Sequence, residues 1–171
     1  SCALYSSDST GEHRVMCWGG GGSGQIGDGG SSSLSSPAST DLVMLDSTTS
    51  LGASDGSETL SSSPYDVVDV SLSEIGKFGC ARSSQGHVKC WGYNAYGQLG
   101  HGNTSTASDG ENEMGEGLAF VPLGANRTAT SLSVGENHAC ALLDDGNVKC
   151  WGRNNYGQLG MGTTTQIGDG P

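Results

Sequence analysis

The chain has 171 residues, enough for one ordinary domain, but 30 of them are Gly and only 33% are hydrophobic, so apolar material for a core is thin. Its formal net charge is -11, from 7 Lys and Arg against 18 Asp and Glu. Both a nucleic-acid partner and an anionic membrane surface need clustered cations, and neither is expected here. No stretch approaches the roughly 20 apolar residues of a membrane-spanning helix, so no membrane span is expected.

The chain opens with the first of three related hairpins. The phrase "SCALYSSDSTGEHRVMCWGG" gives two strand candidates around a long loop, followed by a Gly-rich turn, and residues 1–29 are assigned to a partial first repeat. Residues 30–65 are rich in Ser, Thr and Gly and predict a surface insertion, with one short strand at "DLVML" (41–45). A loop with O-linked sugars and an unmodified loop are two alternatives for this insertion, and the sequence favours neither.

Two fuller repeats follow the insertion. Residues 66–117 are assigned to a second repeat with an acidic linker, and residues 118–171 to a third repeat with the start of the next linker. The Cys-Trp-Gly triplet recurs after 73 residues (Cys17 to Cys90) and again after 60 (Cys90 to Cys150), a spacing that favours a propeller or solenoid. No segment has sustained helical periodicity, so the predicted fold class is all-β. The strand candidates are "YDVVDVSLS" (65–73), Leu118–Leu123, Thr128–Val134, Ala139–Leu143 and Val148–Trp151.

Six cysteines fall into three pairs, one in each hairpin. If the two cysteines of the last hairpin face each other, residues 144–146 remain as a three-residue turn with Gly in its last place. Facing positions on an antiparallel pair lie within disulfide reach, and none of the pairs has Cys-x-x-Cys zinc spacing. We expect disulfides, with free buried thiols and metal ligation as the alternatives. The predicted pairs are Cys2–Cys17, Cys80–Cys90 and Cys140–Cys150.

Disulfides imply an oxidising compartment. Two sequons agree with this expectation, Asn103-Thr104-Ser105 and Asn126-Arg127-Thr128, and predict N-linked glycans on Asn103 and Asn126. The expected location is therefore extracellular or at the cell surface.

The phrases "CWGYNAYGQLGHGN" and "CWGRNNYGQLGMGT" resemble the repeat of the regulator of chromosome condensation family. "HACALLDDGNVKCWG" is similar to the disulfide-bearing version of secreted members. Residues 66–163 fit well, residues 1–29 loosely and residues 30–65 hardly. The resemblance implies four-stranded antiparallel blades arranged as a propeller. About three repeats are present here, and a propeller needs about four to eight blades, so this chain is not expected to close a ring by itself.

The recurring residues of the repeat have structural roles in this reading. Trp suits the space between blades, Asn can hold a turn through side-chain bonds to the backbone, and Gln can bond backbone groups inside the adjoining loop. These roles explain the residue types without catalysis. The predicted repeat-packing residues are Trp18, Trp91, Trp151, Gln25, Gln98, Gln158, Asn94 and Asn154.

Neither an enzyme nor a metal protein is expected. The four histidines occupy different places in the repeat, so no nucleophile and base recur together, and we assign no catalytic residue. The run "SDGENEMGEG" (108–117) could bind calcium through Asp109, Glu111 and Glu113. It lacks the spacing of a calcium loop, and a solvated loop is the alternative. No other cofactor is expected.

Two functional hypotheses remain. The first is a non-catalytic structural component of an extracellular, glycosylated repeat assembly, such as a filament, whose partners are further repeats of the same chain or other copies of it. No counterpart of "AFVPLGANRTATSLSVGENH" precedes Ser1, so another segment is expected to supply those strands. The second is an extracellular propeller module that binds a protein or glycan through Tyr93, Tyr96 or Tyr156. The resemblance also brings in nucleotide exchange on a small nuclear GTPase, a remote alternative for a disulfide-bearing chain.

Overall fold

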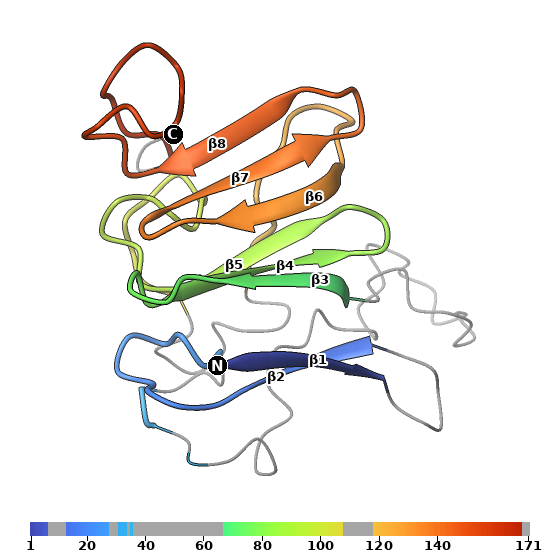
Figure 1. Ribbon diagram of the computed structural model, residues 1–171, viewed down its shortest axis with the longest axis vertical. Helices are drawn as coiled ribbons and strands as arrows, with labels where there is room; N and C mark the ends of the chain where they lie inside the picture. Colours follow the sequence, from blue (N-terminus) through green and yellow to red (C-terminus); the bar gives the residue numbers. More distant parts are fainter. Residues whose placement is uncertain (7–12, 28–30, 34, 36–66, 108–117, 169–171) are drawn as a thin grey trace, which may run out of the picture.

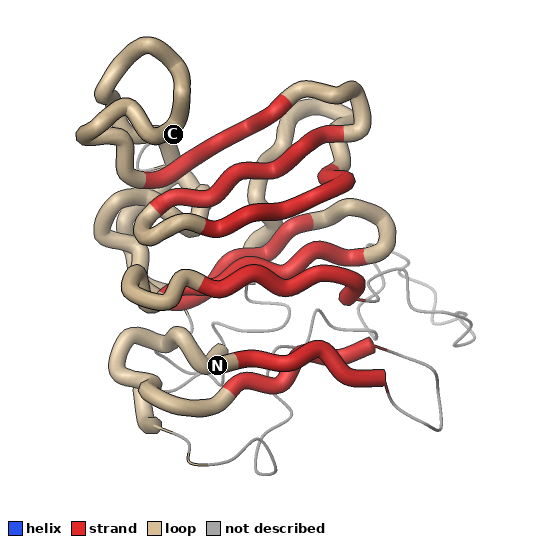
Figure 2. Tube along the Cα trace, viewed as in Figure 1, coloured by secondary structure: helices blue, strands red, loops and turns tan. Residues whose placement is uncertain are grey.

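A computed structural model describes residues 1–6, 13–27, 31–33, 35, 67–107 and 118–168. These ranges hold eight strands and no helix, and they form three antiparallel sheets, one in each repeat. The sheets lie one above the other like steps, with the first repeat at one end and the third at the other (Figures 1 and 2). The strands are β1 (Cys2–Ser6), β2 (His13–Cys17), β3 (Val67–Leu72), β4 (Phe78–Ser83), β5 (Val88–Gly92), β6 (Ala129–Val134), β7 (His138–Leu143) and β8 (Val148–Gly152).

Each repeat is built on a hairpin whose two cysteines face each other. The Cα atoms of the facing cysteines are 4.0 to 4.1 Å apart, and a disulfide joins them in all three hairpins, in the pairs that the hairpin register predicts. Gly86 and Gly146 close the second and third turns with φ of 82° at both positions. This left-handed conformation favours glycine, and it is the bulge residue that a three-residue hairpin loop requires.

An outer strand flanks the hairpin in the second and third repeats. β3 pairs with β4 and β6 pairs with β7, and each pair has a register shift at the same place, between Val67 and Asp69 and between Ala129 and Ser131. β3 also packs against both strands of the first hairpin, while β6 packs against β3 and β4. The outer strand of each repeat therefore makes the contact with the repeat before it.

The predicted all-β fold class is confirmed, and the described sheets have two, three and three regular strands of each expected four-stranded blade. The predicted strand Leu118–Leu123 does not join the third sheet. It lies along β5 of the second sheet, through one bridge at Phe120 and one hydrogen bond from the Val121 N–H to the Val88 carbonyl at 2.8 Å. Pro122 has no N–H to donate, so regular pairing cannot continue there. The fourth place in the second sheet is thus taken by a segment of the next repeat.

The buried apolar residues form two clusters, one at each junction between repeats. Trp91 lies in the cluster between the first and second repeats, with Val15 and Ile26, and Trp151 lies in the one between the second and third, with Val88 and Leu99. The described residues therefore form two junction cores and no single central one, which fits the small amount of apolar material in the sequence.

Several expectations fall outside the described residues. The insertion at 30–65, with its "DLVML" strand, is described only at 31–33 and 35, and the calcium candidates Asp109, Glu111 and Glu113 are not described at all. Within the described ranges, no helix is long and apolar enough to cross a membrane.

Candidate functional site

The repeats are joined through the indole of each buried tryptophan. Trp91 Nε1 donates to the backbone carbonyl of Gln25 at 3.2 Å, and Trp151 Nε1 donates to that of Gln98 at 3.0 Å. Both tryptophans are buried. A buried indole needs an acceptor, and here the acceptor always belongs to the repeat before. Trp18, which is partly buried, makes no such bond to any residue of the described ranges.

The glutamine side chains shape the loops that supply these carbonyls. In every repeat the glutamine Oε1 accepts a backbone N–H from two residues earlier, at 2.7 Å for Gln25, 2.9 Å for Gln98 and 3.0 Å for Gln158. The Gln98 Nε2 also reaches Asn137 Oδ1 of the next repeat at 3.4 Å. Each glutamine therefore fixes its own loop with its side-chain oxygen. The backbone carbonyls of Gln25 and Gln98 also accept the indole N–H of the tryptophan in the next repeat.

The asparagines hold the segment that follows each loop. Asn94 Nδ2 donates to the carbonyls of Asn103 and Ser105 at 2.9 and 2.8 Å, and its Oδ1 accepts the Leu99 N–H at 2.9 Å. Asn94 and its counterpart Asn154 are fully buried, so these hydrogen bonds satisfy polar groups whose burial would otherwise cost stability. Asn154 makes the same three bonds, with Thr163, Thr165 and Leu159.

The first repeat replaces this asparagine with Gly21. A Cβ on Gly21 would overlap the backbone of Ser32, and the Gly21 N–H donates to Ser33 Oγ at 3.4 Å. The backbone of residues 31–33 thus occupies the space in which an asparagine side chain would lie. The sequence contains no signal for this close approach beyond the glycine itself.

One aromatic stack lies at the surface of the second junction. The Arg153 guanidinium is 5.0 Å from the ring centroid of Tyr96 and 5.5 Å from that of Tyr156. Tyr156 is 84% exposed, whereas Tyr93 and Tyr96 are partly buried. Tyr and Arg are the residues that dominate binding energy at protein interfaces, so this stack is the best-formed candidate contact among the three tyrosines.

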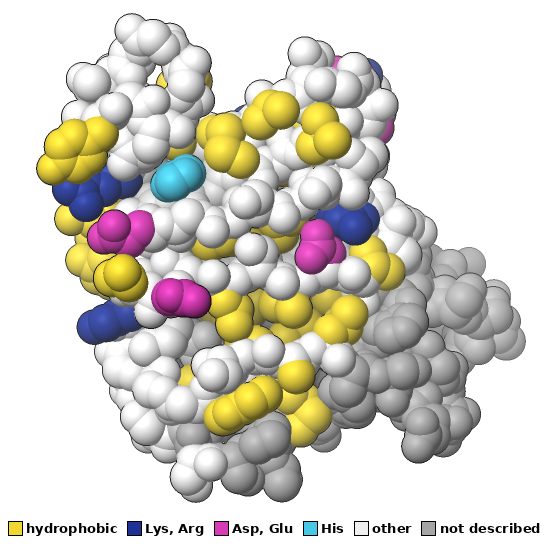
Figure 3. All heavy atoms as spheres, viewed as in Figure 1, with side chains coloured by type: hydrophobic (Ala, Val, Ile, Leu, Met, Phe, Trp, Pro, Cys, Tyr) yellow, Lys and Arg dark blue, Asp and Glu magenta, His cyan; other side chains and the backbone are white. Residues whose placement is uncertain are grey.

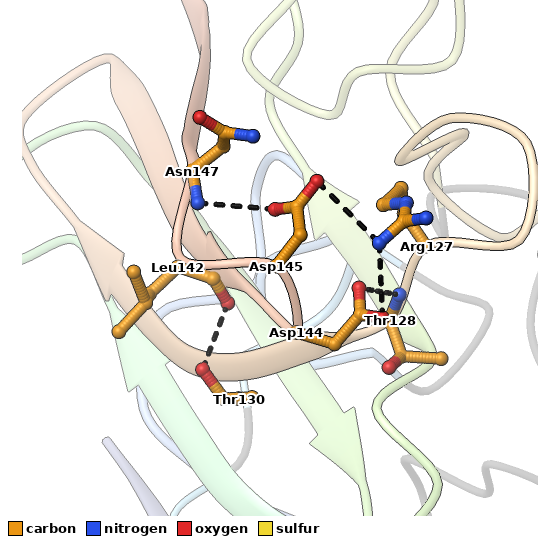
Figure 4. Close-up of polar contacts among 7 residues, drawn as sticks. All are labelled: Arg127, Thr128, Thr130, Leu142, Asp144, Asp145 and Asn147. Carbon is orange, nitrogen blue, oxygen red and sulfur yellow. Dashed lines mark hydrogen bonds and ion pairs between the residues drawn. The ribbon is translucent and has the colours of Figure 1, made fainter.

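A polar cluster surrounds the second sequon (Figure 4). Arg127 Nη1 lies 3.2 Å from Asp144 Oδ2 and 3.4 Å from Asp145 Oδ2, and the Thr128 N–H donates to Asp144 Oδ1 at 3.1 Å. The Asn147 backbone N–H, followed by its side chain, holds the pKa of Asp145 below its usual range. These exposed ion pairs add little stability, but they tie the loop that carries the sequon to the hairpin turn.

Both sequon asparagines lie at exposed turns. Asn126 adopts a φ of 57°, and Asn103 accepts the Ser105 N–H with its side-chain oxygen at 2.9 Å. Exposed turns are the positions at which an attached sugar can be accommodated.

Clusters of histidine, cysteine and carboxylate side chains are the usual metal-binding sites of proteins. No cluster of three or more His, Cys, Asp or Glu that could hold a metal occurs among the described residues. Burial lowers the pKa of His101, while a hydrogen bond with the Ala119 backbone acts in the opposite direction. His101 lies in the loop region of the second repeat and contacts the segment that covers β5.

Known proteins share these repeats. The family model described as "Regulator of chromosome condensation (RCC1) repeat" matches residues 67–98 and 129–158 in one form and residues 85–142 in another. The chain is 32% identical over 165 residues to the "Ultraviolet-B receptor UVR8" of Arabidopsis thaliana, covering 96% of this chain and 30% of that protein. It is 30% identical over 159 residues to the human "E3 ubiquitin-protein ligase HERC2", covering 92% of this chain and 3% of that protein.

A solved structure agrees on the fold. The crystal structure of human WBSCR16 aligns with 97% of this chain and 49% of its own length, with a TM-score of 0.50 and 20% sequence identity. This chain thus spans under a third of the first relative and about half of the solved structure, so the likeness concerns the repeats and their fold.

Proposed function

We propose a function from one established premise: the chain belongs to the regulator of chromosome condensation (RCC1) repeat family. On this premise the chain is a non-catalytic structural component of an extracellular, glycosylated repeat assembly. The observation that carries the proposal is the modular build of the molecule: each repeat has its own disulfide, and the second and third repeats are each joined to the repeat before.

The disulfides support the extracellular part of the proposal. Each closes a loop of ten to fifteen residues, which stabilises the folded chain by about 3 kcal/mol in the chain-entropy account. Three such bridges offset the thin core, and they persist only where the surroundings are oxidising. The exposed sequons at Asn103 and Asn126 agree with passage through a secretory pathway.

The junctions support the structural part. Where each repeat contacts only its neighbours, stability is a sum of repeat and interface contributions, and the array can be extended without changing its parts. The indole-to-carbonyl bond and the buried tryptophan occur at both junctions with nearly the same geometry. The partners in this proposal are further repeats of the same chain or other copies of it, with attached glycans.

The non-catalytic part rests on the repeat pattern. The residues that recur, Trp, Asn, Gln and Gly, are occupied with turns and junctions, and the histidines do not recur with a nucleophile. The activities in the names of the receptor and the ligase are properties of proteins much longer than this chain.

Electron microscopy of the native material tests the proposal. Protein recovered from the culture medium should appear as extended particles whose width varies at a regular interval. Treatment with a reductant should shorten or dissolve these particles. Material that remains inside the cell as isolated compact particles would contradict the structural assignment.

A binding module is the second candidate function, and the exposed stack of Arg153 with Tyr96 and Tyr156 favours it. A panel of immobilised glycans and extracellular proteins provides the test. Binding that is lost in Tyr156→Ala and kept in Val148→Ala, a change of an exposed side chain at the opposite end of β8 from Arg153, would support this candidate. Extended particles without any such binding would favour the structural function.

A further inference from the structure

One extended segment, Leu118–Leu123, closes the junction between the second and third repeats, and we call it the covering segment. A bridge between Phe120 and Lys89 and a hydrogen bond from the Val121 N–H to the Val88 carbonyl at 2.8 Å hold it against β5. Its leucine and valine side chains are buried. So few backbone bonds leave the place of the covering segment dependent on the side chains around it.

Basic side chains approach the covering segment from two strands. On the β5 side, Lys89 Nζ lies 4.7 Å from the ring centroid of Phe120, and the His87 ring lies 5.2 Å from the same centroid. From β8, Lys149 Nζ donates to the Pro122 carbonyl at 2.6 Å. The chain has only 7 Lys and Arg and a net charge of -11, and on the face seen in Figure 3 these side chains are scattered. The surroundings of the covering segment are therefore a basic region in an acidic chain.

His101 is a further basic group of this region, and it bonds the backbone of the covering segment. Its ring hydrogen-bonds the Ala119 backbone, and its Nε2 atom is buried without a hydrogen-bond partner among the described residues. Burial, and to a smaller degree the nearby charge of Lys89, lower the pKa of His101, while the Ala119 bond acts in the opposite direction. Lys89 is itself only 5% exposed. The neutral imidazole therefore fits this position better than the imidazolium.

A proton added to His101 would make the closed junction unfavourable. The new N–H at Nε2 would be buried with no acceptor among the described residues, and it would place a second cation beside Lys89. The groups that face the covering segment from β5 and β8 are Lys89, His87 and Lys149, which are all basic, and the segment itself has no titratable side chain. None of these groups compensates the new charge. The charged ring is stabilised by reaching water, and it reaches water when the covering segment moves off β5.

We propose that His101 is a pH-sensitive latch, whose neutral ring holds the covering segment on β5 and whose protonated ring releases it. Histidine suits this role because it changes charge between about pH 5 and 8. The disulfides Cys80–Cys90 and Cys140–Cys150 keep both hairpins intact while the segment moves. The junction between the second and third repeats is thus closed at neutral pH and loosened in an acidic compartment. The latch belongs to the junction itself and is independent of the structural function proposed above.

Native-state hydrogen exchange of the isotope-labelled, oxidised chain tests the latch. The protection factor of the Val121 amide reports how often the covering segment opens, with the pH dependence of the intrinsic exchange rate already removed. A single histidine with an ordinary pKa of about 6.5 in the open state should reduce this factor by up to about tenfold between about pH 7.5 and about pH 5.5. The Ala129 N–H donates to the Gly86 carbonyl at 2.8 Å across the same junction and should keep its protection.

Three variants assign the response to His101. His101→Gln stays neutral at every pH and should remove the pH dependence of Val121 protection. His138→Gln is the matched control, because His138 is also partly buried but packs on Gly135 of its own repeat, and it should keep the dependence. Lys89→Met retains an unbranched side chain without the charge and should make the fall smaller, which decides the case if His101→Gln does not fold.

Three outcomes would overturn the proposal. The first is a Val121 protection factor that does not change with pH in the unaltered chain. The second is a pH response that persists in His101→Gln. The third is an equal loss of protection at Val121 and Ala129, because it would mean that the two repeats separate as wholes.

Discussion

Gly100 and Gly160 offer a direct test of the packing between repeats, because they occupy the same place in successive loops. Their φ angles are 71° and 72°, so an alanine at either position has the same unfavourable left-handed backbone. That conformation costs about 1–2 kcal/mol for a residue with a Cβ. Only the surroundings differ. At Gly100 the new methyl group would lie 2.9 Å from Cδ1 and Nε1 of Trp151 and 3.1 Å from Val121, whereas at Gly160 it would meet nothing.

The expected losses in the free energy of unfolding follow from these distances. Gly160→Ala should lose only the backbone contribution, about 1–2 kcal/mol. Gly100→Ala should lose this and the cost of overpacking a buried junction, about 1–3 kcal/mol more. Urea unfolding with the disulfides intact, followed by tryptophan fluorescence, measures both losses. The denaturant slope should stay the same in both variants, since a changed slope would mean that more than stability has changed.

Equal losses in the two variants would refute this account of the junction. Gly86→Ala and Gly146→Ala repeat the comparison at the hairpin turn, where both φ angles are 82° and only Gly86 is covered. The larger loss should again belong to the second repeat.

Three further predictions concern the junction, the solution pH and the sugars. Trp151→Phe should lower the free energy of unfolding by about 1–3 kcal/mol, because it leaves the buried Gln98 carbonyl without a donor. The indole of Trp18 has no hydrogen-bond partner among the described residues, so Trp18→Phe should lower the free energy of unfolding by less in the same urea assay. Burial lowers the pKa of His101 in the folded chain. The contribution of this residue to stability is therefore complete above its unfolded pKa of about 6.5 and is lost as the pH falls toward the folded pKa. His101→Gln should flatten this part of the profile of melting temperature against pH. Intact-mass analysis of the secreted protein should give a glycosidase-sensitive shift that falls in steps in Asn103→Gln and Asn126→Gln, and an unchanged mass would contradict the glycan assignment.

Local sequence signals predict the hairpins and their disulfides well. The distance between two cysteines and the glycine at the end of the turn fix which residues face each other, and the facing cysteines are bonded in the structure. The roles of Asn94 and Gln98 within their own loops follow in the same way, since their side chains bond the backbone only a few residues away. The family resemblance also follows from these short phrases.

Long-range partners are what the sequence does not specify. Leu118–Leu123 has the alternation of a strand, but nothing in it says which sheet it joins, and it joins the sheet of the preceding repeat. The hydrogen bond from the Trp151 indole also cannot be predicted from the sequence, because its acceptor is a backbone carbonyl and every residue has one. The different exposures of Val88 and Val148, which begin strands of identical sequence, are likewise apparent only in three dimensions.

Light scattering of the purified, oxidised chain across a broad range of concentration tests the central claim most directly. The account predicts that the mass of the particles rises with concentration, because a structural repeat unit adds to further copies of itself. A compact monomer at every concentration, with all three disulfides intact, would contradict the claim that this chain is a structural repeat unit that adds to others.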